Sequence, residues 1–215
     1  MKKTLSVATA VSLALLSTAG HAETQNSIRL DVSANAVLTT LDDGFDEVSI
    51  SETSMQGLLT LQSAFGAYAE LGTAKFTVDE IEINGRTWEV DEDYDANMLG
   101  LGFRFQTPDA AGQYLGLGLR QTEYPDADND SMTVRAFSEK DTDLRYGVIE
   151  VAYTSDDESS LLGVSGRHVW FFNGVVGLGV NWGVGFGSID TPSGYPDIDT
   201  GTAHIGGILM IRPRF

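Results

Sequence analysis

Cysteine is absent from the 215 residues, which excludes disulfide bonds and thiolate metal sites. Proline is scarce, with five in all, and no segment shows a sustained apolar period of 3.6 residues, so amphipathic helices are not expected. Basic residues number 13 against 31 acidic residues, and a chain this acidic does not seek the phosphates of nucleic acids. After residue 22 no apolar run reaches the ~18 residues of a transmembrane helix, so any membrane-spanning structure must be a closed β-barrel.

Residues 1–22 have the three parts of a secretory signal peptide. Lys2 and Lys3 form a basic start, an apolar segment follows, and Gly20 and Ala22 place small residues before a cleavage site. The apolar segment is shorter than the ~20 residues of a spanning helix, which disfavours a membrane anchor. We therefore expect export to the periplasm and one mature domain over residues 23–215.

The chain does show an alternation of apolar and mixed positions, which is clearest in residues 204–215. One phase is almost entirely apolar and the other is mixed, as a strand between lipid and a polar lumen requires. The apolar phase consists of Ile205, Gly207, Leu209, Ile211, Pro213 and Phe215, and the mixed phase of His204, Gly206, Ile208, Met210, Arg212 and Arg214. The aromatic terminus, Phe215, resembles the signal by which barrel-assembly machinery recognises bacterial outer-membrane barrels. Pro213 departs from the usual ending because it cannot donate to a sheet.

Similar alternating segments recur along the whole mature chain. The candidate strands span residues 27–39, 48–62, 64–78, 95–107, 113–124, 131–139, 143–155, 159–171, 175–188 and 202–215. Long acidic connections alternate with short ones, which is typical of outer loops and periplasmic turns. An even strand number is needed, and ten is favoured. Eight would require residues 131–139 to be a loop and one other strand to be misread.

The pattern therefore predicts an all-β fold: a closed, antiparallel, transmembrane β-barrel in the lipids of the cell outer membrane. Within the acidic connection at 79–94, Asn84-Gly85 indicates that two strands project past the membrane as a hairpin. The outward phase carries aromatic residues that would anchor the barrel at the membrane interfaces. They are Tyr153, Trp170, Trp182, Phe186 and Phe215.

Charged residues on the opposite phase are expected to face the lumen. They are Arg29, Asp31, Glu70, Arg104, Arg120, Arg135, Glu150 and Arg167. Charges confined in a lumen are costly unless they are paired or hydrated. We therefore interpret these residues as an ion-pair network that plugs the barrel and fixes its register. The alternative is a narrow polar path for small solutes or ions. Ten strands are far fewer than the roughly 16–18 of open porins, which favours the plug.

No motif predicts catalysis or a cofactor. The repeated Gly-Leu-Gly lacks the third glycine and the helix of a phosphate loop, and Ser165 lacks the context of a nucleophile elbow. A lipid-modifying enzyme using His204 stays a second alternative, although no serine partner is evident. The acidic run 126–130 copies the start of a calcium loop but lacks its later ligands, so weak divalent-cation binding at acidic loops is the most that it supports.

The signal peptide, the Gly-Leu-Gly strands and the C-terminal strand together resemble the small outer-membrane barrels of Gram-negative bacteria. Within this class, residues 98–120 are similar to the YfaZ-type family. That resemblance implies an outer-membrane barrel without an established activity, and it provides no catalytic residues to carry over.

Overall fold

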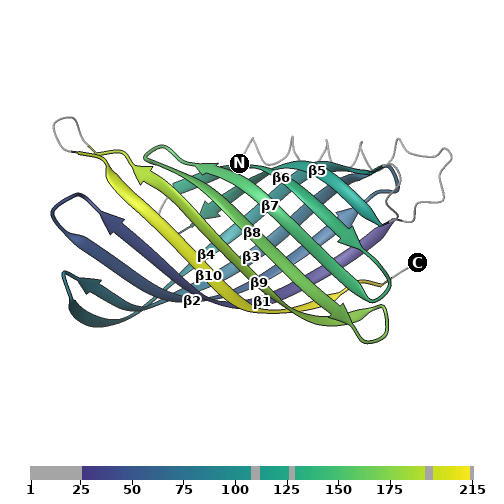
Figure 1. The fold of residues 1–215 in the computed structure, drawn as a ribbon, viewed down its shortest axis with the longest axis horizontal. Coiled ribbons are helices and arrows are strands. Elements are labelled where there is room, and N and C mark those ends of the chain that lie inside the picture. Colours follow the sequence, from purple (N-terminus) through teal and green to yellow (C-terminus); the bar gives the residue numbers. More distant parts are fainter. Residues whose placement is uncertain (1–25, 108–111, 126–128, 192–195, 214–215) are drawn as a thin grey trace.

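The computed structural model describes residues 26–107, 112–125, 129–191 and 196–213, and these form ten β-strands (Figure 1). The strands are β1 (Ser27–Asp42), β2 (Glu47–Gln62), β3 (Ala67–Ile83), β4 (Arg86–Gln106), β5 (Gln113–Tyr124), β6 (Asn129–Asp141), β7 (Arg145–Ser155), β8 (Ser159–Phe171), β9 (Val176–Ile189) and β10 (Ile198–Ile211). None of these residues lies in a helix long and apolar enough to cross a membrane. The expected signal peptide, residues 1–22, lies outside the described residues.

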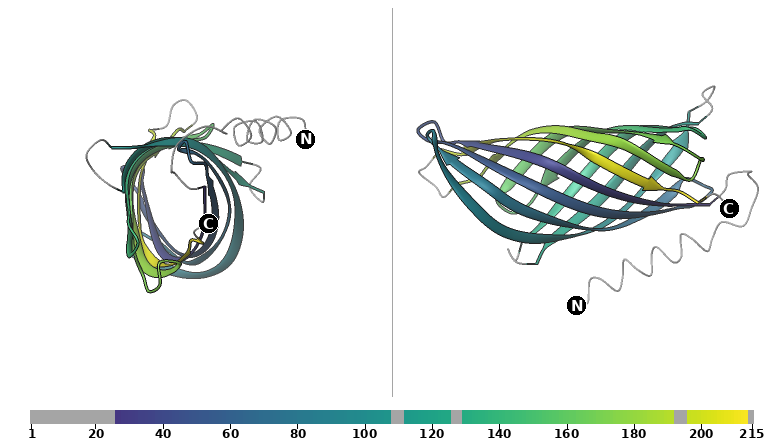
Figure 2. Two further views of the ribbon diagram at one scale, coloured as in Figure 1. Left: turned by 90° about the vertical axis from the view of Figure 1, so that its right-hand side faces the viewer. Right: turned by 90° about the horizontal axis from the view of Figure 1, so that it is seen from below.

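Each strand pairs antiparallel with its neighbours in the chain, and β1 pairs with β10 from Leu30↔Ile211 to Asp42↔Asp199. The sheet therefore closes on itself, and no strand is left with an unpaired edge (Figure 2). Both the expected fold and the strand number of ten are confirmed, because residues 131–139, the weakest candidate, lie within β6.

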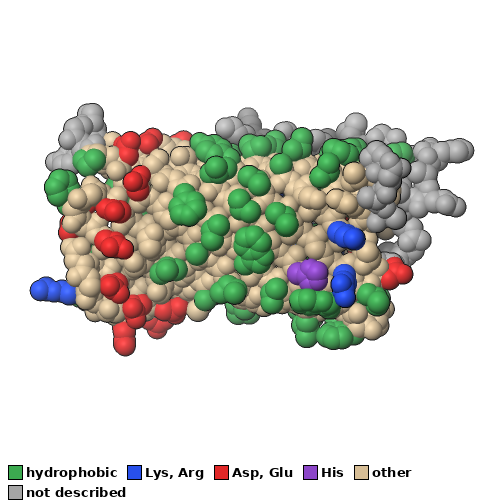
Figure 3. All heavy atoms as spheres, in the orientation of Figure 1, with side chains coloured by type: hydrophobic (Ala, Val, Ile, Leu, Met, Phe, Trp, Pro, Cys, Tyr) green, Lys and Arg blue, Asp and Glu red, His purple; other side chains and the backbone are tan. Residues whose placement is uncertain are grey.

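Side chains alternate between the two faces of this sheet as expected. The outer face is apolar and uncovered, with Ile205 67 % and Phe186 72 % exposed, whereas Asp31 and Glu70 on the inner face are each 4 % exposed. Apolar side chains cover the middle of the visible outer wall, and acidic side chains gather at one end (Figure 3). We call that end the loop end, and the opposite end, where β10 finishes, the turn end.

The structure corrects the boundaries of the expected hairpin. Residues 79–94, expected as a connection, are mostly strand, because β3 and β4 extend to a turn of only Asn84 and Gly85. Both turn residues have positive φ, 50° and 76°, which is the geometry of the hairpin turn that Asn-Gly favours. The pairing of these two strands as a hairpin is thereby confirmed.

The last strand also differs from the expected span of 202–215. It begins earlier, at Ile198, and ends at Ile211. Arg212 leaves the pairing with β1, since its N–H donates to the carbonyl of Val175 and its guanidinium to the carbonyls of Gly174 and Thr142. Phe215, the expected assembly signal, lies outside the described residues.

Between β1 and β2, the Asp43 carboxylate organises the turn at the loop end. Its Oδ1 accepts hydrogen bonds from the N–H of Asp46 at 2.7 Å and of Phe45 at 2.8 Å. These donors lower the pKa of Asp43 below its ordinary value of 3.8.

We expect the contribution of Asp43 to the turn to be complete above its ordinary pKa and to be lost as pH falls through the lowered pKa. Asp43→Asn should keep the turn and remove its pH dependence, because the amide oxygen accepts the same bonds. NMR titration of the labelled carboxyl in micelles measures the midpoint. A midpoint at or above the ordinary value would contradict the assignment.

Candidate functional site in the barrel lumen

All eight charged residues expected in the lumen take part in ion pairs across it. The structure adds Glu139, and these nine residues, five arginines and four carboxylates, are here called the charge network. They are Arg29, Asp31, Glu70, Arg104, Arg120, Arg135, Glu139, Glu150 and Arg167.

Glu70 on β3 is the centre of one half of the network. Its Oε2 accepts hydrogen bonds from Arg135 at 2.5 Å and from Arg120 at 2.9 Å. Arg135 also binds Glu150 at 3.2 Å and donates to the hydroxyl of Tyr68 at 3.1 Å. Glu70 and Arg135 are both 4 % exposed, so neither charge has water as an alternative partner.

Asp31 and Glu139 are the centres of the other half. Asp31 Oδ2 lies 3.1 Å from both Arg29 and Arg167. Glu139 pairs with Arg104 and more distantly with Arg29, and it accepts a hydrogen bond from the hydroxyl of Tyr146. If the alternation is continued from Phe137 to residue 139, it places Glu139 in the lumen. Residue 139 was the expected end of that strand, so Glu139 was not counted among the lumen charges.

The glycines of β4 and β5 make room for these contacts. Gly100 lies between Glu70 and Arg120 in the register, and a Cβ there would meet Glu70 Oε2 at 3.0 Å. A Cβ at Gly102 or Gly118 would overlap the Tyr68 ring or hydroxyl. The Gly-Leu-Gly repeats of β4 and β5 therefore form a thin wall over which large lumen side chains reach.

The network leaves almost no free space at its level. The cavity among its side chains measures about 30 Å³, room for roughly two water molecules. Towards the loop end lies a larger cavity of about 290 Å³, which we call the loop-side cavity. Ser33, Gln56, Tyr124 and His204 are among its lining. The free space in the lumen is therefore larger on the loop side than among the side chains of the network.

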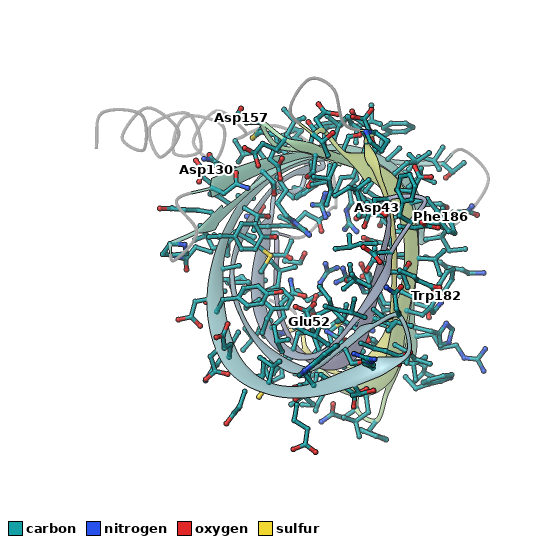
Figure 4. All side chains as sticks on the ribbon, turned by 90° about the vertical axis from the view of Figure 1, so that its left-hand side faces the viewer. Asp43, Glu52, Asp130, Asp157, Trp182 and Phe186 are labelled. Atoms are coloured by element: carbon teal, nitrogen blue, oxygen red, sulfur yellow. The ribbon has the colours of Figure 1, made fainter. Side chains whose placement is uncertain are left out.

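Looking into the loop end, Glu52 lies within the ring of strands, and Trp182 and Phe186 lie outside it (Figure 4). Glu52 accepts a hydrogen bond of 2.7 Å from the hydroxyl of Tyr94. The expected anchoring aromatics Tyr153, Trp170, Trp182 and Phe186 are all exposed on the outer wall, while Phe215 lies outside the described residues.

The candidates for other chemistry do not assemble into a site. His204 points into the lumen against Gly183, and no hydrogen bond between described residues joins it to a serine. His168 packs its ring on Trp170 at 4.4 Å. Within the described ranges no three His, Asp or Glu residues are placed to hold a metal ion. Of the calcium-like run, residues 126–128 lie outside those ranges.

No family model matches the chain, and no curated protein matches its sequence. Solved structures of similar shape are outer-membrane proteins. An outer-membrane channel from Pseudomonas putida F1 is 7 % identical, with 90 % of this chain and all of that chain covered and a TM-score of 0.46. The β domain of the Bordetella autotransporter BrkA is 9 % identical, with 89 % and 100 % covered and a TM-score of 0.46. The KdgM porin is 9 % identical, with 82 % and 98 % covered and a TM-score of 0.38. Likenesses this weak say nothing of what this chain does.

Proposed function

We propose that this protein is an outer-membrane β-barrel whose lumen is plugged by the charge network and whose acidic loops face the medium. The membrane placement is supported by the wide apolar outer wall, because exposing so large an apolar surface to water is unfavourable. The orientation is supported by the β3–β4 hairpin, which extends at the loop end, and by the acidic side chains that gather at that end. The role that follows is structural, or one of interaction at the cell surface.

The single observation that carries the plug is the free volume of about 30 Å³ among the network side chains. A solute or hydrated ion cannot pass this level unless paired arginines and carboxylates separate. Such separation is costly, because a buried charge that loses its partner is left desolvated.

The loop-side cavity supports a second candidate, a narrow channel, since it brings bulk solvent to the network. Passage would then require the network to rearrange. In that case Arg120→Ala and Glu150→Ala should change ion selectivity, because both side chains line the cavity.

Planar-bilayer recording separates the two candidates. We expect no steady current from the wild-type barrel. Arg104→Ala with Glu139→Ala removes a matched pair and its volume, so this double variant should conduct. Lys75→Ala with Asp93→Ala removes a pair from the projecting hairpin and serves as the control, which should stay closed. A steady single-channel current from the wild type would replace the plug with the channel.

A further inference from the structure

The outer wall near the turn end has a concave surface that the charge network does not explain. It lies across β6, β7 and β8 and encloses about 680 Å³. Gly147 and Gly166 form its floor, and Ile149 and Trp182 are among its apolar lining. We call it the wall groove.

Positive charge gathers at this groove. Lys140 and Arg145 line it together with His168, and both cationic side chains are exposed. In the register Lys140 pairs with Gly147, and Gly147 pairs with His168, so the cation and the imidazole flank a residue without a side chain. Lys or Arg side chains stand beside a histidine near the turn end of the visible face (Figure 3).

This grouping is unusual in a chain with a net charge of −18. Elsewhere on the described exterior, Lys75 is held by Asp93 at 2.5 Å, and Arg86 begins β4 at the far, acidic end. None of the ion pairs between described residues includes Lys140 or Arg145. The two cations of the groove therefore stay available for an anion from outside the chain.

The order of residues along the strands matches the order of parts in a phospholipid. Arg145 begins β7 at the turn end, Gly147 follows with Lys140 and His168 beside it, and Ile149 comes next. Ile149 pairs with Gly166, which pairs with Trp182. The lining of the groove thus changes from cationic at the rim of the barrel to apolar further along the strands.

We propose that the wall groove binds an anionic phospholipid of the periplasmic leaflet. Its phosphate lies between Lys140, Arg145 and His168, and an acyl chain lies over Gly147 beside Ile149 and Trp182. Charge complementarity selects the headgroup, and the glycine floor admits the chain. The site rests on the proposed membrane placement of the barrel.

Trp170 and Trp182 beside the groove provide an intrinsic probe, since the third tryptophan, Trp88, lies on the projecting hairpin. The protein is refolded into phosphatidylcholine vesicles that contain either brominated phosphatidylglycerol or brominated phosphatidylcholine. We expect stronger quenching by the anionic lipid, corresponding to a preference on the order of tenfold. Lys140→Gln with Arg145→Gln should abolish the preference, whereas Lys75→Gln with Arg86→Gln, which removes the same charge, should keep it.

Gly147→Leu tests the groove itself. A Cβ at Gly147 meets nothing closer than His168 Nδ1 at 3.5 Å, so the barrel tolerates the side chain while the acyl site is filled. The preference should fall in this variant although both cations remain. An unchanged preference would reduce the site to general attraction and overturn it. Equal quenching by both lipids in a folded, protease-protected wild type overturns the lipid site alone. Failure to insert at all overturns the membrane placement as well.

Discussion

Replacing Arg135 by alanine is expected to lower the free energy of unfolding of the barrel by about 3–5 kcal/mol. Arg135 is the shared partner of Glu70 and Glu150, and it lies at 2.5 Å from the first and 3.2 Å from the second. Its removal leaves Glu150 without an ion-pair partner among the described residues and leaves Glu70, which is 4 % exposed, with Arg120 alone. Urea titration of the refolded protein in vesicles, followed by tryptophan fluorescence, measures the loss.

Lys75→Ala is the matched control, because it also breaks one cation–carboxylate pair. That pair is open to solvent on both sides, with side chains 57 % and 50 % exposed, so its loss should change stability little. Equal effects of the two substitutions would show that burial of the network does not govern its contribution.

Gly206→Ala is expected to destabilise the closed barrel by about 1–3 kcal/mol, the usual cost of overpacking. Gly206 faces the lumen on β10, where its backbone pairs with Asn35 of β1. A Cβ there would overlap the backbone carbonyl of Ala34 and come within 2.8 Å of the Asn35 Cα, so the first and last strands would have to separate. The fraction of protein that migrates as a folded barrel on unheated gels reports the defect.

The neighbouring position provides the control for this variant. A Cβ at Gly207 has no atom within 4 Å, because it projects from the outer wall. Gly207→Ala should therefore fold as well as the wild type. If the two substitutions behave alike, backbone propensity and not crowding at the β1–β10 junction explains the effect.

Period-two alternation was sufficient to predict the strands and their faces. The span of residues 113–124 and of residues 159–171 agrees with β5 and β8, because lipid on one side demands an apolar residue at every second position. The signal fails where that demand ends. Residues 79–94 are rich in acidic side chains, so they were expected as a connection with a hairpin at Asn84-Gly85, although β3 and β4 extend through them to that turn.

The same limit applies to the lumen. Alternation placed Glu70 and Arg135 on the inner face, but it could not pair residues that are 65 positions apart. Which charges meet depends on strand tilt and register around the whole barrel, and these follow from closure rather than from any one segment. The wall groove was not predicted for a related reason, since the residues named in its lining lie on four strands and no single strand marks it.

The pairing of β1 with β10 also constrains how the molecule can be made. Ser27–Asp42 is synthesised well before Ile198–Ile211, yet half of its hydrogen-bonding groups find their partners only when that last strand is made. Until then the growing sheet has two unpaired edge strands, and such edges can pair with other chains. Chains cut short before residue 198 should therefore accumulate as aggregates instead of smaller barrels.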